Sequence, residues 1–441
     1  MVWEDRVMYN RAQDILLLLI GLMFILTLSN CSSNEISEGV NDFINDNIQY
    51  FSHVLSFGSE ISNTPDEFLL VTTSNFSLTD NACIIGDEFS LKIFNTDGKA
   101  IKRMGRRGQG PYEFQRMFSI FSSPYNYITT VQYPNIYLII SPEYEFITQE
   151  RLRLPNSINN FILKETGCKN INLIKIELKK VLPLNNNFMV FVLELTDQDL
   201  FNDFVLCYFK NDDDYQPIVL FKKPDILRWT QNNIDDLSKG GATIGPDIGR
   251  YQIDLLLGEK VLYYTSHEDS IVSINEAYYT INIYSLADSA LQKYKYKYDP
   301  IPYPSVKTID NYYREGYGNS YKQWENMVKV ELEHYKNKKY LPAIINITID
   351  GNYLFVFFKK QWQTRPEFNI KNKKYFDVDI IDLGSMKLIH IIKLPEIYQN
   401  IKGGFMYDGD SDENGFRIIS KYKINPIVYG LPEDSDWRVK K

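Results

Sequence analysis

The sequence has few of the residues that build disulfide frameworks and metal sites. It contains four cysteines and four histidines in 441 residues. No two cysteines form a C-x-x-C pair, and no two histidines have metal-ligand spacing such as H-E-x-x-H. If Cys31 is lipidated, as argued below, an odd number of cysteines remains, which argues against a disulfide framework. Cys83 and Cys207 lie in apolar runs, where a free cysteine behaves as a small buried hydrophobe.

The common catalytic and nucleotide-binding motifs are also missing. The sequence has no G-x-S-x-G nucleophile elbow, no P-loop and no strand followed by G-x-G-x-x-G and a helix. We therefore predict no catalytic residue, no cofactor and no metal ligand. The formal net charge is −8, and no basic stripe offsets it, so the sequence does not favour a nucleic-acid partner.

The longest apolar run is too short to span a membrane. Ile15 to Leu28 contains fourteen residues without a charge, against about 20 for a spanning helix. The run Leu28-Ser29-Asn30-Cys31 follows the pattern of a lipobox, although asparagine stands where a small residue is usual. We predict a lipoprotein signal peptide at residues 1–30, acylation of Cys31 as the link to the membrane, and a polar tether at 31–41. An uncleaved anchor helix or a plain secretory signal remains the alternative.

Aromatic residues are abundant and favour an all-β fold. The chain has 32 tyrosines and 26 phenylalanines, which suit half-buried pleated surfaces. An apolar strand, a polar turn and a returning strand recur five times, at 93–104, 136–154, 205–222, 281–298 and 378–394. Further apolar strands are expected at 188–195, 253–265 and 415–424, and at 344–358, which contains its own turn at Asp350-Gly351. Four-stranded units built this way are typical of a propeller blade, and the wide spacing of the hairpins indicates insertions.

The most specific pattern follows the first hairpin. The run G-R-R-G-Q-G-P-Y-E-F cannot continue a strand, because its glycines and proline have little strand propensity. The hairpin and this exit resemble the bacterial six-bladed β-propeller lipoprotein family, a relative of NHL-type repeats. Tyr112 departs from the glycine common in the family. The matching motif residues are Gly105, Arg106, Gly108, Gln109, Gly110, Pro111, Glu113 and Phe114.

The resemblance implies an exported six-bladed propeller at the bacterial cell envelope, facing the periplasm or the cell surface. We place the propeller at 42–430, a helical insertion at 303–340 and a C-terminal tail at 431–441. Strands from both ends of the propeller are expected to share one blade, which removes free sheet edges. In the motif, Arg103, Arg106 and Arg107 beside backbone N–H groups are compatible with an anion nest. We favour a structural clamp between blades, with Glu113 pairing an arginine.

The insertion is predicted to contain an amphipathic helix. Ser320 and Gln323 form a capping-box pattern. The expected apolar face consists of Trp324, Met327, Val328, Leu332 and Tyr335. Four nearby tyrosines were considered as surface rings that could stack on sugars, namely Tyr312, Tyr313, Tyr317 and Tyr321.

An acidic run at 408–414 resembles half of a calcium loop. Ile419 occupies the twelfth position, where a calcium loop needs a glutamate, so a solvated hairpin turn is the better interpretation.

These observations predict an exported, lipid-anchored propeller that binds a peptide, protein or glycan and is not itself catalytic. The alternative is a propeller lactonase, lyase or hydrolase with a metal site in the central channel.

Overall fold

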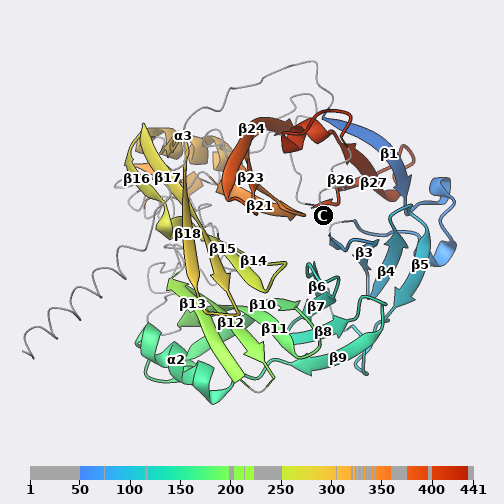
Figure 1. Cartoon of the computed structure of the whole chain (residues 1–441), viewed down its shortest axis with the longest axis horizontal. Coiled ribbons are helices and arrows are strands. Elements are labelled where there is room, and N and C mark those ends of the chain that lie inside the picture. Colours follow the sequence, from blue (N-terminus) through green and yellow to red (C-terminus); the bar gives the residue numbers. More distant parts are fainter. Residues whose placement is uncertain are drawn as a thin grey trace, which may run out of the picture.

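The computed structural model describes residues 50–435 apart from 74, 115–117, 198–202, 213, 223–250, 304, most of 319–343, 359–374 and 396–399. The predicted signal peptide, Cys31 and most of the predicted amphipathic helix, including Trp324, lie outside the described residues. Within them, six antiparallel sheets surround a central axis and form a six-bladed β-propeller (Figure 1).

Each blade has four consecutive strands counted from the axis outward. Blade 1 consists of β2 (Phe76–Leu78), β3 (Ala82–Asp87), β4 (Ser90–Asn95) and β5 (Ala100–Met104). Blade 2 consists of β6 (Phe118–Ser122), β7 (Ile128–Gln132), β8 (Ile136–Ile140) and β9 (Phe146–Arg151). Blade 3 consists of β10 (Ile174–Pro183), β11 (Phe188–Asp197), β12 (Asp203–Asn211) and β13 (Asp214–Lys222).

The other three blades contain the additions to this plan. Blade 4 consists of β14 (Tyr251–Leu256), β15 (Lys260–Thr265), β17 (Glu276–Ser285) and β18 (Leu291–Lys297), with the short β16 (Ser270–Ser273) beside β17. Blade 5 consists of β21 (Ile344–Asp350), β22 (Tyr353–Phe358), β23 (Tyr375–Asp382) and β24 (Lys387–Pro395). Blade 6 consists of β25 (Ile401–Lys402), β26 (Phe405–Ser411), β27 (Arg417–Ile424) and β1 (Phe51–Phe57).

The five predicted hairpins are the outer strand pairs of blades 1 to 5, so this part of the prediction is confirmed. The segment expected as one strand at 253–265 is instead a hairpin, β14 and β15. Gly258 and Glu259 both have positive φ there and make a tight turn that the apolar pattern concealed.

The ring is closed by strands from distant parts of the chain. β1 pairs antiparallel with β27, from Phe51 opposite Ile424 to Phe57 opposite Ile419. The outermost strand of blade 6 therefore comes from the N-terminal side and its other strands from the C-terminal side, as the sequence predicted. This pairing covers an edge of β27 that would otherwise offer unpaired backbone groups.

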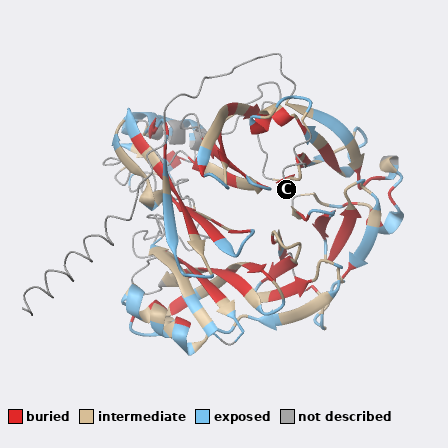
Figure 2. Ribbon diagram, in the orientation of Figure 1, coloured by how far each residue is buried: buried red, intermediate tan, exposed pale blue. Residues whose placement is uncertain are grey.

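The core is divided among the blade boundaries. Six clusters of buried apolar residues occur, and each joins two neighbouring blades. The second strands β3 and β22 are buried at every position, because both of their faces pack against other blades. Figure 2 shows this burial in the inner strands and exposure along the outer rim. Continuous apolar runs for inner strands follow from this packing.

Two α-helices whose bounds lie within the described residues interrupt the β pattern. α2 (Asn156–Thr166), which the sequence analysis did not predict, lies at the outer edge of blade 3 and buries Ile158 and Ile162 (Figure 1). The i,i+4 spacing of these isoleucines and the left-handed cap at Gly167 were the available signals. α3 (Val306–Tyr317) lies in the predicted insertion. The short pair β19 (Ile301–Pro302) and β20 (Tyr340–Leu341) joins the two ends of this insertion.

In the described part of the chain, no helix combines the length and the apolar character needed to cross a bilayer.

Candidate functional site

The topology separates the two faces of the ring. A blade of four antiparallel strands returns the chain to the face from which it entered, so every connection between blades lies on one face, here called the connection face. On the opposite face, here called the turn face, consecutive strands of a blade are joined by turns of two to five residues. The chain after β27, with the short 3-10 helix Pro426–Tyr429, also begins on the turn face. The longer segments, including α2, β16 and the insertion with α3, all begin and end on the connection face. Such connections are where binding residues concentrate on a rigid scaffold.

The Gly105–Phe114 motif is the connection from β5 of blade 1 toward β6 of blade 2. Its two ends are held together by backbone hydrogen bonds, in which Gly108 N–H donates to the Phe114 carbonyl at 3.1 Å and Phe114 N–H donates to the Arg106 carbonyl at 2.9 Å. The motif is therefore a closed loop. Its backbone groups form hydrogen bonds within the loop instead of extending the sheet of blade 1.

Glu113 occupies the centre of this loop. Its carboxylate accepts a hydrogen bond from Gly110 N–H at 2.7 Å and one from Arg106 Nε at 2.6 Å. The Gly110 N–H and the Arg106 side chain lower the pKa of Glu113, because both favour the charged carboxylate. The predicted arginine partner of Glu113 is thus Arg106. The anion nest considered from the sequence is filled by a carboxylate of the motif itself.

Two glycines of the motif are required by close contacts. A Cβ at Gly108 would lie 1.9 Å from Glu113 Oε2. A Cβ at Gly105 would lie 2.3 Å from the Phe114 ring, and Gly105 also has a φ of 76°. A side chain at either position would displace the residue that the loop is built around.

The motif attaches to blade 2 through aromatic rings. Phe114 is fully buried and stacks on Phe118 of β6 with ring centroids 4.0 Å apart. Tyr112 adopts a positive φ of 61°, stacks on Phe146 of β9 and donates its N–H to Gln149. Tyr112 thus adopts the left-handed backbone conformation that the glycine common in the family would adopt at this position. The remaining motif residues, Gln109 and Pro111, are exposed.

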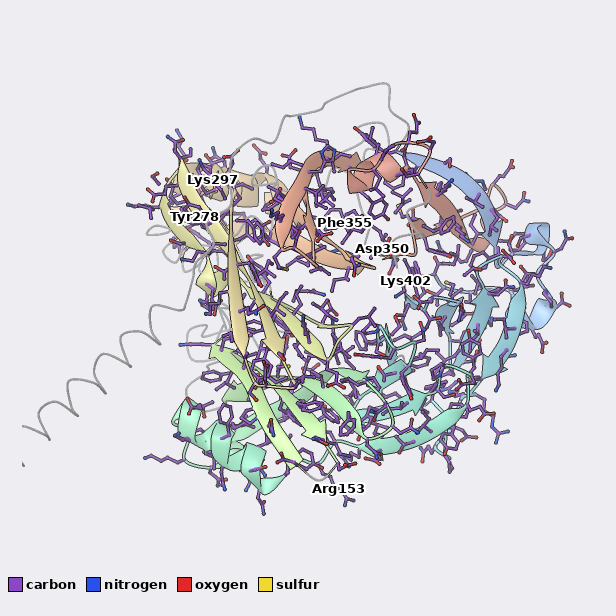
Figure 3. The ribbon with its side chains drawn as sticks, viewed as in Figure 1. Arg153, Tyr278, Lys297, Asp350, Phe355 and Lys402 are labelled. Carbon is purple, nitrogen blue, oxygen red and sulfur yellow. The ribbon has the colours of Figure 1, made fainter. Side chains whose placement is uncertain are left out.

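Polar contacts also join the inner strands of neighbouring blades. Asp350 is the most buried of these groups: its carboxylate accepts from Gly403 N–H at 2.6 Å, from Gly404 N–H at 2.9 Å and from the Tyr429 hydroxyl at 2.7 Å. Figure 3 shows Asp350 and Lys402 together at the inner ends of blades 5 and 6. Burial raises the pKa of Asp350, and its three donors oppose that shift. Sequence analysis had treated Asp350 only as part of a turn.

Similar links occur at four other boundaries. They are Lys402 to Asp80 at 3.1 Å, Ser77 to Ser122 at 2.9 Å, Asn135 to the Ile176 carbonyl at 2.9 Å, and Lys180 to Asp254 at 2.9 Å. At the boundary of blades 4 and 5, two polar contacts come from the outer strands. The Tyr279 hydroxyl donates to Asp379 at 2.7 Å, and the Tyr296 hydroxyl donates to the Met386 carbonyl at 2.9 Å. Between the inner strands of these two blades lies a cavity of about 290 Å³.

Tyr321 and the three cysteines of the described residues are buried. Tyr321, considered as a surface ring, is buried, and its hydroxyl donates to Asp310 at 2.5 Å while Arg314 lies over its ring, so that expectation was wrong. Cys83, Cys168 and Cys207 are buried and free. Burial raises the pKa of the Cys83 and Cys207 thiols.

In the acidic run, Asp412 accepts from the N–H groups of Asn414 and Phe416 and shapes the turn between β26 and β27. Within the described residues, no group of three His, Cys, Asp or Glu side chains is arranged to share a metal ion.

The fold and its closure define a six-bladed β-propeller. Residues 28–168 match the model of a protein family described as "6-bladed beta-propeller", so the six-bladed propeller that the motif indicated is confirmed. No curated protein sequence matches the chain.

Solved structures with a similar fold include three bacterial or peptide-binding examples. An exported protein from Bacteroides fragilis is 14% identical, with a TM-score of 0.41 over 85% of this chain and 94% of that one. BamB from Moraxella catarrhalis is 8% identical, with a TM-score of 0.32 over 81% and 86%. YCF48 bound to D1 peptide is 9% identical, with a TM-score of 0.31 over 88% and 87%. At these values the likeness concerns the fold alone.

Proposed function

We propose that this protein is an exported, lipid-anchored propeller that binds a peptide, protein or glycan at the bacterial cell envelope. The observation that carries this proposal is the contrast between its two faces. In the described residues, the turn face joins consecutive strands only by short turns, whereas every long segment between two strands begins and ends on the connection face. A rigid ring with elaborated loops on one side is the arrangement of a binding scaffold.

The position of the N-terminal strand supports the anchored arrangement. Phe51, the first residue of β1, pairs with Ile424, whose N–H donates to the carbonyl of Gly404 in a turn of the turn face. The chain from Cys31 therefore enters the propeller at the turn face. The connection face therefore lies on the opposite side of the ring from the point where the tether joins it, which leaves that face open to a partner.

The length of the tether is compatible with this arrangement. Nineteen residues separate Cys31 from Phe51, and at about 3.3–3.6 Å per extended residue they span at most roughly 65 Å. The match to the propeller family begins at residue 28, within the proposed lipobox. Lipidation also predicts firm membrane association, because two or three acyl chains bind far more strongly than one.

The anchor is tested by replacing its acceptor. Cys31→Ala should abolish labelling by a fatty-acid analogue and move the protein from the detergent phase to the aqueous phase. The matched control is Cys83→Ala, which should leave labelling unchanged. Labelling of Cys31→Ala equal to that of the wild type contradicts the anchor.

Binding is tested by capture from native envelopes. Wild-type protein immobilised with its connection face free should retain a defined envelope component, and protein attached through that face should not. Absence of any specific capture in both orientations contradicts a binding function.

A further inference from the structure

We propose that the cavity between blades 4 and 5 is a binding site for a neutral sugar ring, an inference that rests on the proposed binding function and names one ligand class for it. The cavity opens between the first inner strands of the two blades. It is lined by Tyr251, Gln252, Tyr264, Ile344, Ile345, Asn346 and Ile347.

The cavity lies at the connection face. Tyr251 and Ile344 are the first residues of β14 and β21, where the chain enters blades 4 and 5. Tyr264 pairs with Gln252 near the end of β15, at the same side of the ring. The site is therefore on the face that the tether leaves open, beside the segments that extend blade 4 and connect it to blade 5.

The cavity has a floor of buried residues and a rim of half-buried residues. Tyr264, Ile344 and Ile347 are 1%, 3% and 3% exposed, whereas the other four lining residues are partly exposed. The floor is apolar apart from the Tyr264 hydroxyl, which already donates to Asp269 at 2.9 Å. Tyrosine and isoleucine surfaces of this kind suit the apolar C–H face of a sugar ring.

The two carboxamides of the rim are held in fixed orientations. The side-chain N–H of Gln252 donates to Asp254, and that of Asn346 donates to Thr348 at 3.1 Å. Both partners lie two residues further along the same strand, where side chains share a face. With the amide nitrogen held, each carbonyl oxygen is a positioned acceptor, which matches the hydroxyl donors of a sugar.

The absence of charged lining residues and the small volume of the cavity restrict the class of ligand further. No Lys, Arg, His, Asp or Glu is among the lining residues, so a charged ligand would lose hydration without gaining an ion pair. A volume of about 290 Å³ is at the lower limit of small-molecule pockets, which accommodates one ring and not an extended chain.

A peptide bound as an added strand is less suited to this place. Strand addition needs a regular sheet edge, and β21 has a bulge between Ile344 and Asn346, directly at the cavity. The bulge interrupts the ladder where a peptide would have to pair.

The experiment uses the full-length protein in detergent and an array of immobilised neutral and anionic oligosaccharides, followed by calorimetry with the methyl glycosides of glucose, galactose, mannose and N-acetylglucosamine. Wild-type protein should bind at least one neutral sugar. Asn346→Leu and Gln252→Leu should each weaken that binding at least tenfold with an unchanged melting temperature. Asn187→Leu, at an exposed turn on the opposite face, is the matched control and should bind as the wild type does.

A second variant keeps the test decisive if a leucine variant does not fold. Ile345→Phe adds bulk at the half-buried rim without removing a hydrogen bond and should also reduce binding. Sugar binding that all folded cavity variants retain, binding of anionic sugars only, or binding of peptides but no sugar each overturns this inference and leaves the proposed binding function standing. Failure of the protein to capture any envelope component contradicts the proposed function itself.

Discussion

At the scale of single residues, the motif depends on glycines that make room for larger side chains. Gly105→Val would force the buried Phe114 ring out of place, because the added Cβ would lie 2.3 Å from the ring and Gly105 has a φ of 76°. We expect an insoluble protein or a loss of at least about 3 kcal/mol in the free energy of unfolding, measured by urea denaturation. Gly384→Val is the matched control, since Gly384 is exposed and has no positive φ, and it should change stability by less than about 1 kcal/mol.

Glu113→Gln tests the same loop without adding bulk. The Arg106 side chain is 81% exposed, so loss of this ion pair should change the urea midpoint only slightly. A large fall in the urea midpoint of this variant would contradict the expectation that the ion pair contributes little.

A second residue-scale prediction concerns Asp350. Its carboxylate accepts three hydrogen bonds in a buried site, and an asparagine would turn an N–H₂ group toward one of these donors. Asp350→Asn should therefore lower the free energy of unfolding by about 2–4 kcal/mol in urea denaturation. Asp97→Asn, at an exposed turn of the same face, should be nearly neutral. Equal stability of the two variants would show that the three contacts contribute little.

At the scale of elements, we expect the fold to require strand β1 but not the tether that precedes it. A chain that begins at residue 50 keeps β1 and should unfold cooperatively at the wild-type temperature. A chain that begins at residue 59 lacks β1, including the buried Phe57, and exposes the edge of β27. We expect this shorter chain to aggregate or to lose cooperative unfolding in thermal melts followed by circular dichroism. A normal melt of the shorter chain would mean that the ring does not depend on this pairing.

At the scale of the whole molecule, the boundary of blades 4 and 5 should make stability depend on pH. Burial raises the pKa of Asp379 to about 7 and that of Asp269 to about 8, in each case from 3.8. A carboxyl group with a raised pKa in the folded state stabilises the fold below its unfolded pKa, and this contribution is lost as the pH rises through the folded value. The free energy of unfolding should therefore fall between pH 5 and pH 8, by up to about 1.4 kcal/mol per pH unit for each group.

Asp379→Asn provides the test, because asparagine can still accept the hydrogen bond from the Tyr279 hydroxyl but does not titrate. The decrease in stability between pH 5 and pH 8 should be smaller in this variant, and smaller again when Asp269→Asn is added. A wild-type protein whose urea midpoint is constant over this range would contradict the raised pKa values.

The sequence by itself determined the all-β class, the five outer hairpins and the closure of the ring. These depend on alternation of apolar residues and on turn residues, which act over a few positions and can be recognised locally. The motif at 105–114 was also visible, because its glycines, proline and glutamate occur at an unusual density.

Only the tertiary structure decided which groups meet. Glu113 pairs with Arg106 within seven residues, but Asp350 meets Gly403 and Tyr429 across a blade boundary. The cavity between β14 and β21 brings together Gln252 and Asn346, which are distant in sequence. Such contacts depend on how separate blades pack in the ring, and no pattern within one blade specifies them.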